Sequence, residues 1–136
     1  MVVFLSGKMA PSKDLECEGL QACLEMIEAQ ADAERIFLLC CASIDPETGK
    51  PWCPDCRAAE PVINGLKSLL KPGDVYILCR AYDKQTWKDP NNEFRSHPKF
   101  LMKTVPSLWQ WGKPMRIEDE AAADAELVTK LFQGQD

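Results

Sequence analysis

Two cysteines three residues apart carry the main chemical signal of this sequence. They are Cys53 and Cys56, in the run Trp52-Cys53-Pro54-Asp55-Cys56. A dithiol reduces a disulfide in two steps: one thiolate attacks and forms a mixed disulfide, and the second thiol then releases the reduced target. The spacing therefore predicts either redox chemistry of this kind or part of a metal site.

The expected position of the pair at the start of a helix assigns the two roles. Residues three apart on a helix share one face, so the two thiols can meet. Cys53 would lie beside unpaired N–H groups and the positive end of the helix dipole, which stabilise a thiolate and lower its pKa. Pro54 suits the first helical turn, where its missing N–H does no harm. We predict Cys53 as the nucleophile and Cys56 as the resolving thiol.

Asp55 is expected to act on this pair in two opposing ways. Its charge disfavours a neighbouring thiolate by repulsion, whereas a negative charge in the first helical turn is itself favourable. We hypothesise that Asp55 selects targets by repelling acidic ones. The alternative is a helix-start acid without a catalytic role, and the sequence leaves both open.

Zinc is the main competing interpretation of the pair, with Cys40 and Cys41 as further ligands. Structural zinc sites usually have two ligand pairs, each on a tight turn. Cys40 and Cys41 are adjacent on an expected strand, so they point to opposite faces and do not easily share one metal. We therefore predict no metal site. The cysteines outside the pair are interpreted as buried small side chains: Cys17, Cys23, Cys40, Cys41 and Cys79.

Composition limits the class of protein. The 136 residues fit one domain, expected to span the whole chain, 1–136. A net charge of −5 without a basic cluster argues against nucleic acid or a membrane as partner. No apolar run approaches the ~20 residues that cross a bilayer. An odd number of cysteines, seven, and an N-terminus without signal-peptide features predict a cytoplasmic protein with reduced thiols.

Apolar patterns before the pair predict the first half of an α/β sheet. Residues 2–5 are expected as a short strand, and Ser12 as the cap of a helix whose apolar stripe runs from Leu20 to Ala31. The continuous apolar run 36–42 is typical of a strand buried on both faces. A polar loop, 43–50, would then lead to the pair.

The segments after the pair complete the pattern. A helix is expected from Cys56 to Leu70, with Pro61 inside it. The later elements are expected as a strand at 75–81, a polar segment at 83–99 with a turn at 89–92, strands at 108–111 and 115–117, and a helix at 121–131. The order predicts a mixed sheet with helices packed on its faces.

These segments together resemble thioredoxin. The resemblance is carried by Trp-Cys-x-x-Cys after a buried strand, by Pro61 in the following helix, and by Val105-Pro106-Ser107 before a later strand. A closer resemblance, to the thioredoxin domain-containing protein 17 group, is carried by Trp-Cys-Pro-Asp-Cys and residues 43–51, 59–62 and 87–95. It extends from about Ile36 through the C-terminal helix, and implies a thioredoxin fold with a central mixed sheet flanked by helices on both faces.

The resemblance also implies roles for residues outside the dithiol. Pro106 is expected as a cis-proline facing the dithiol, with the backbone of Val105 binding an extended target peptide. Trp52 is expected to combine packing with a flat apolar surface for targets. Electrons are expected from NADPH through thioredoxin reductase, with no bound cofactor. The expected targets are small disulfides such as cystine, persulfides, or selected cytosolic proteins.

One departure from thioredoxin concerns proton transfer. Thioredoxin carries a buried Asp in the strand before its site, where it acts on the resolving thiol, but residues 36–42 contain no acid. Glu60 and Asp45 are the candidate proton acceptors in this chain. The segment 83–99 is longer than its counterpart in thioredoxin and is expected to restrict which proteins dock.

A second class of function remains open at this point. The chain could be a thioredoxin-fold adaptor that binds signalling proteins and uses its redox site as a switch. An adaptor would tolerate loss of Cys56, whereas a dithiol reductase acting over many turnovers would not. An isomerase or oxidase would need an oxidising compartment, which the N-terminus does not favour.

Overall fold

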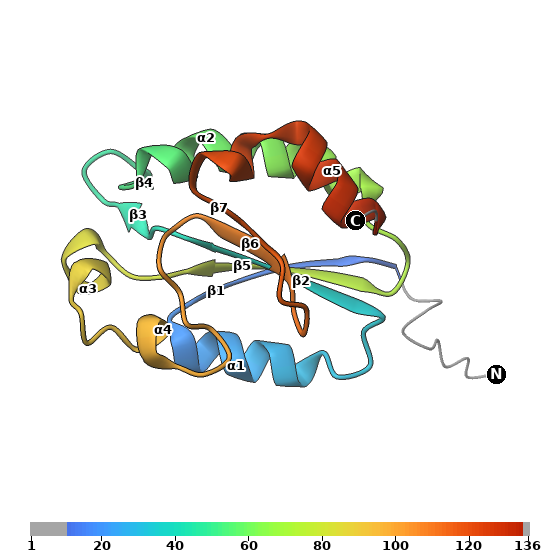
Figure 1. The fold of residues 1–136 in the computed structure, drawn as a ribbon, viewed down its shortest axis with the longest axis horizontal. Coiled ribbons are helices and arrows are strands. Elements are labelled where there is room, and N and C mark those ends of the chain that lie inside the picture. Colours follow the sequence, from blue (N-terminus) through green and yellow to red (C-terminus); the bar gives the residue numbers. More distant parts are fainter. Residues whose placement is uncertain (1–10, 135–136) are drawn as a thin grey trace.

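A computed structural model describes residues 11–134, and the strand expected at 2–5 lies outside them. One sheet is sandwiched between helices (Figure 1). Helices α2 (Pro54–Leu66) and α5 (Ala125–Gln133) cover one face, and α1 (Leu20–Ala29) covers the other. The three-layer arrangement confirms the predicted fold class.

The sheet is mixed, with strand order β1-β5-β2-β6-β7. Its first three strands are parallel, and the last two are antiparallel to their neighbours. The strands are β1 (Lys13–Glu18), β2 (Arg35–Cys41), β5 (Asp74–Arg80), β6 (Ser107–Gln110) and β7 (Arg116–Glu118). Five residues of β2, from Phe37 to Cys41, are fully buried, as the apolar run predicted for a central strand.

Strand β1 corrects the expected N-terminal helix start. Ser12 was predicted to cap a helix, but the residues after it form an edge strand beside β5. Leu15 and Cys17 are half-buried between exposed neighbours, which is the period-two pattern of a strand with one covered face. The chain turns into α1 at Gly19, whose φ of 92° favours glycine and whose Cβ would lie 3.1 Å from the Tyr82 hydroxyl.

Short elements lie in the segments expected as loops. Strands β3 (Ile44–Asp45) and β4 (Lys50–Pro51) form a small hairpin just before the dithiol. Helix α2 continues through Pro61 and ends in the 3-10 turn η1 (Lys67–Leu69). The C-terminal helix begins later than predicted because Asp124 caps α5, and η2 (Asp119–Ala123) precedes it.

The segment after β5 is folded rather than an open polar loop. It contains α3 (Lys84–Lys88) and α4 (Glu93–Ser96), which Trp87 and Phe94 anchor by their buried rings. The predicted turn between these helices is present, where the Asn92 N–H donates to the Asp89 carbonyl. Within residues 11–134 no helix combines the length and the apolar character needed to cross a membrane.

Candidate active site

The dithiol lies where β2, the β3–β4 hairpin and α2 meet. Cys53 is the residue before α2 and has an extended backbone, and Pro54 occupies the first helical turn as predicted. Cys53 keeps 7% of its surface exposed, whereas Cys56 is fully buried. An incoming disulfide therefore has access to Cys53 and not to Cys56.

Cys56 is enclosed by the end of β2. The backbone N–H of Ala42 donates to the Cys56 sulfur across 3.3 Å, and the Cys41 thiol also hydrogen-bonds to it. Both donors favour the ionised form of Cys56, so they lower its pKa against the effect of burial. The strand that the sequence marked as apolar thus supplies the groups that stabilise a buried thiolate.

The pKa of Cys53 departs from the expected direction. Burial raises it to about 11, although the backbone N–H groups of Cys56 and Asp55 act to lower it. The helix start therefore has the predicted effect, but desolvation outweighs it in the reduced protein, and the prediction of a lowered pKa is wrong. The two thiols are hydrogen-bonded to each other, so the titration of each depends on the state of the other.

A cis peptide bond faces the dithiol. The bond between Val105 and Pro106 is cis, as the resemblance to thioredoxin implied. The Val105 carbonyl lies 3.6 Å from the Cys53 sulfur. Ser107 fixes the turn by donating to the Thr104 carbonyl across 2.8 Å. The backbone of Val105 is thus next to the nucleophile, where a bound peptide would have to lie, and its role in binding targets stays a prediction.

Trp52 is fixed beside the dithiol with part of its ring exposed. Its indole N–H donates to the Tyr82 carbonyl across 2.9 Å, and its backbone N–H donates to the Ser43 carbonyl across 3.3 Å. The ring is therefore both packed and available to solvent, which is compatible with the mixed role predicted for it. Asp55 is half-buried in the first turn of α2, and the choice between its two predicted roles stays open.

The site contains an ion pair, between Arg80 and Glu60, that was not predicted from the sequence. Arg80, on β5, donates to the two carboxylate oxygens of Glu60 across 2.7 and 2.8 Å. Its Nη1 atom also donates to the Ala42 carbonyl across 3.1 Å. Because the N–H of Ala42 bonds to Cys56, the single residue Ala42 links the ion pair of Arg80 and Glu60 to the resolving thiol.

Arg80 could have been found from one signal, a charged residue inside the otherwise apolar run 75–81.

The two candidate proton acceptors, Glu60 and Asp45, lie in different surroundings. Glu60 lies one helical turn after Cys56, and its negative charge raises the pKa of that thiol. Asp45 instead supports the β3–β4 turn, where its carboxylate accepts from the Glu47 N–H across 2.9 Å.

Comparison with known proteins agrees with this geometry. Residues 16–134 match the family described as thioredoxin domain-containing protein 17-like, thioredoxin domain. The chain belongs to this family. It is 38% identical to human thioredoxin domain-containing protein 17 over 125 residues, covering 91% of this chain and 98% of the human protein. It is 39% identical to the thioredoxin-like protein Clot of Arabidopsis thaliana over 101 residues, covering 71% and 74% of the two chains.

A solved structure supports the fold alone. The reduced thioredoxin pre-protein of Schistosoma mansoni superposes with a TM-score of 0.52 at 14% identity, covering 90% of this chain and 99% of that one. Membership of a thioredoxin-like family and this fold support a thiol-disulfide oxidoreductase type of role.

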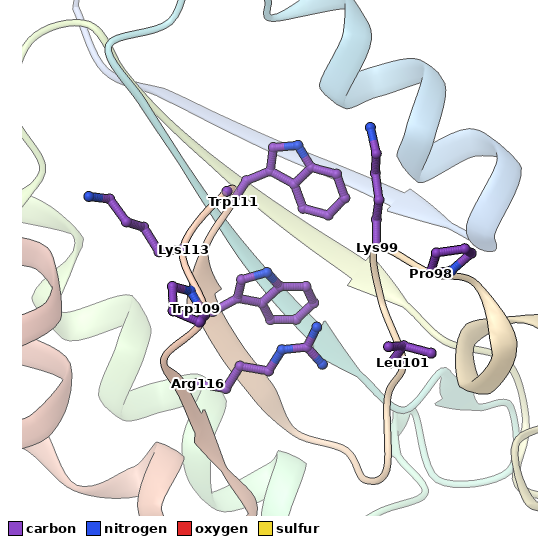
Figure 2. Close-up of a pocket in the computed structure, with 9 residues that line it drawn as sticks. Pro98, Lys99, Leu101, Trp109, Trp111, Lys113 and Arg116 are labelled. Atoms are coloured by element: carbon purple, nitrogen blue, oxygen red, sulfur yellow. The ribbon is translucent and has the colours of Figure 1, made fainter.

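A large groove in this family member lies away from the dithiol. Its volume is about 590 Å³, and it is lined by Trp109 on β6 and by Trp111 just after this strand, with ring centres 6.4 Å apart. Figure 2 shows Arg116 beside the Trp109 ring, and the guanidinium carbon is 4.2 Å from the ring centre. Trp109 is almost fully buried, so its side chain packs in the core. None of the groove's lining residues belongs to the dithiol site.

Proposed function

We propose that this chain is a disulfide reductase of the cytosol. Cys53 and Cys56 would reduce cystine, other small disulfides or selected proteins, with electrons from NADPH supplied through thioredoxin reductase. The observation that carries the proposal is the unequal access of the two sulfurs, 7% exposed for Cys53 and none for Cys56, beside the cis-proline turn. This asymmetry suits a nucleophile and a resolving thiol.

The first step begins with the loss of the Cys53 proton. The Cys53 thiol hydrogen-bonds to the Cys56 sulfur, whose pKa is lowered, so when Cys56 is ionised the proton of Cys53 can pass to it as a target disulfide docks. The Cys53 sulfur then attacks the nearer target sulfur, the target S–S bond breaks, and its other half leaves as a thiolate. The products are a mixed disulfide on Cys53 and a neutral thiol at Cys56.

The second step needs a base for the Cys56 proton. We assign this proton to Glu60, which lies one helical turn away and whose charge already acts on Cys56. The Cys56 sulfur attacks Cys53, the mixed disulfide breaks, and the second half of the target leaves as a thiolate. The oxidised protein then takes two electrons from the reductase, which regenerates the dithiol.

Selectivity would come from the surfaces around Cys53. Trp52 offers part of its ring to a target, and Asp55 places a negative charge beside the nucleophile. The α3–α4 segment begins next to Trp52, since the Tyr82 carbonyl accepts the indole N–H. We propose that this segment limits docking of large proteins, so that small disulfides are favoured.

The test is coupled NADPH oxidation with thioredoxin reductase, comparing cystine, insulin and no substrate. The proposal predicts turnover with cystine that exceeds turnover with insulin, and complete loss in Cys53→Ser. Cys40→Ala is the matched control, because this buried cysteine lies on the opposite face of the sheet from Cys41. Absence of turnover with both disulfides would instead support the adaptor function.

A further inference from the structure

Three cysteine side chains gather on the side of the sheet that α1 covers. They are Cys17 on β1, Cys23 on α1 and Cys79 on β5, and their sulfur atoms all lie within 4.8 Å of one another. From the sequence, each of the three is interpreted as a buried small side chain. The structure shows that residues from three separate elements form a triangle of thiols.

The pairing register of β1 with β5, and the packing of α1 on them, bring the three thiols together. Cys17 and Cys79 are direct partners on neighbouring parallel strands, so their side chains leave the same face of the sheet. Cys23 belongs to the buried stripe of α1, which packs on that face. Cys40 on β2 is the next partner in this row, whereas Cys41 points to the other face, toward Cys56. The triangle and the dithiol are therefore on opposite faces of the sheet.

The size of the triangle suits a metal ion. A metal–thiolate bond of ~2.3 Å places the sulfurs of a trigonal site roughly 4 Å apart. Small rotations of three side chains would contract the observed arrangement to that size. Soft thiolate ligands favour Cu(I) and zinc among the biological metals. Zinc sites of the structural type take four protein ligands, but the triangle supplies three, so the geometry favours Cu(I).

The surroundings of the three thiols provide access from one side. Cys17 is half-exposed on an edge strand, while Cys23 and Cys79 are buried, so an ion can enter from one side. The Cys79 thiol donates to the Gly19 carbonyl across 3.8 Å, at the start of α1, and would give up this hydrogen bond when it loses its proton to a bound ion.

We propose that Cys17, Cys23 and Cys79 bind one Cu(I) ion in a trigonal thiolate site. The thiols release their protons on binding, and the ion keeps its oxidation state, so no electron acceptor is needed. The site is distinct from the Cys53–Cys56 dithiol and does not rest on the reductase function.

The test is an anaerobic titration with Cu(I) against a chromophoric Cu(I) chelator. The protein is the full chain carrying Cys53→Ser and Cys56→Ser, because the dithiol would itself bind copper. We expect one ion per chain, with X-ray absorption showing three sulfur neighbours. Adding Cys17→Ser should weaken binding by about tenfold or more, in line with the effect of losing groups that support a metal site.

Cys40→Ala on the same background is the matched control and should leave the affinity unchanged. Circular dichroism of each variant checks that the fold persists, which Cys17→Ser should allow because Cys17 is half-exposed. The proposal is overturned if no ion binds, if Cys17→Ser binds Cu(I) as well as its parent, or if zinc binds with four sulfur ligands that include Cys40.

Discussion

Arg80 holds both carboxylate oxygens of Glu60, at 2.7 and 2.8 Å, and also donates to the carbonyl of Ala42. The N–H of Ala42 in turn donates to the sulfur of Cys56. Residues of β5 and α2 and the residue that follows β2 are thus joined behind the resolving thiol. This network fixes Glu60, the proposed proton acceptor, one helical turn from the resolving thiol.

Replacing Glu60 by Gln tests its assignment as proton acceptor. The charge of Glu60 raises the pKa of Cys56, so Glu60→Gln should lower that pKa and increase the thiolate fraction at pH 7. If Glu60 accepts the proton, resolution of the mixed disulfide should nevertheless slow by about tenfold to a hundredfold. Single-turnover release of a labelled thiol measures this rate.

Asp45→Asn is the matched control for that measurement. Asp45 supports the β3–β4 turn, and an Asn oxygen can accept the same backbone N–H. Its resolution rate should equal that of the unmodified chain. A Glu60→Gln protein that resolves as fast as the unmodified chain, or faster, would remove Glu60 from the mechanism.

Asp55→Asn tests whether Asp55 selects targets by charge. Removing a negative charge beside Cys53 should raise the rate with an acidic disulfide peptide by about threefold relative to a basic one. The change should shrink at high salt, because exposed charges are screened. Equal shifts for both peptides, or none, would leave Asp55 as a helix-start residue only.

The buried pair of Arg35 and Asp74 is expected to stabilise the fold. Asp74 is 1% exposed and accepts from Arg35 Nε at 2.9 Å and from the Lys71 N–H at 2.7 Å. Asp74→Ala leaves these donors without their partner, so the free energy of unfolding should fall by about 3 kcal/mol. Urea denaturation measures this free energy. The control is Glu126→Ala, which removes an exposed ion pair with Lys130 and should change the free energy of unfolding by less than ~0.5 kcal/mol. Similar losses in both variants would contradict the account.

Elements with strong local patterns were predictable from the sequence. Strand β2 was predicted from a continuous apolar run, and helix α2 from the helical spacing of the apolar residues after Cys56. Strand β1 was missed because its residues are mostly exposed, and only pairing with β5 makes them a strand. Helices α3 and α4 were missed because single buried rings, Trp87 and Phe94, stabilise segments too short to show periodicity.

The functional residues are likewise of two kinds: those that a local motif predicts, and those that only the fold brings together. The dithiol and the cis-proline turn are local motifs, so Cys53, Cys56 and Pro106 could be named from sequence. The direction of the Cys53 pKa depends on burial by distant segments, which spacing alone does not contain. The pairing of Arg80 with Glu60 and the gathering of three cysteines likewise depend on strand register.

Trapping the mixed disulfide shows directly which of the two thiols attacks a target. Cys56→Ser protein, mixed with cystine and analysed by intact and peptide mass spectrometry, should retain one half-cystine on Cys53. The unmodified chain should release cysteine and form the Cys53–Cys56 disulfide, and Cys53→Ser should stay unmodified at Cys56, which is fully buried. An adduct on Cys56 in the Cys53→Ser protein, or none on Cys53 in the Cys56→Ser protein, would contradict the assigned roles.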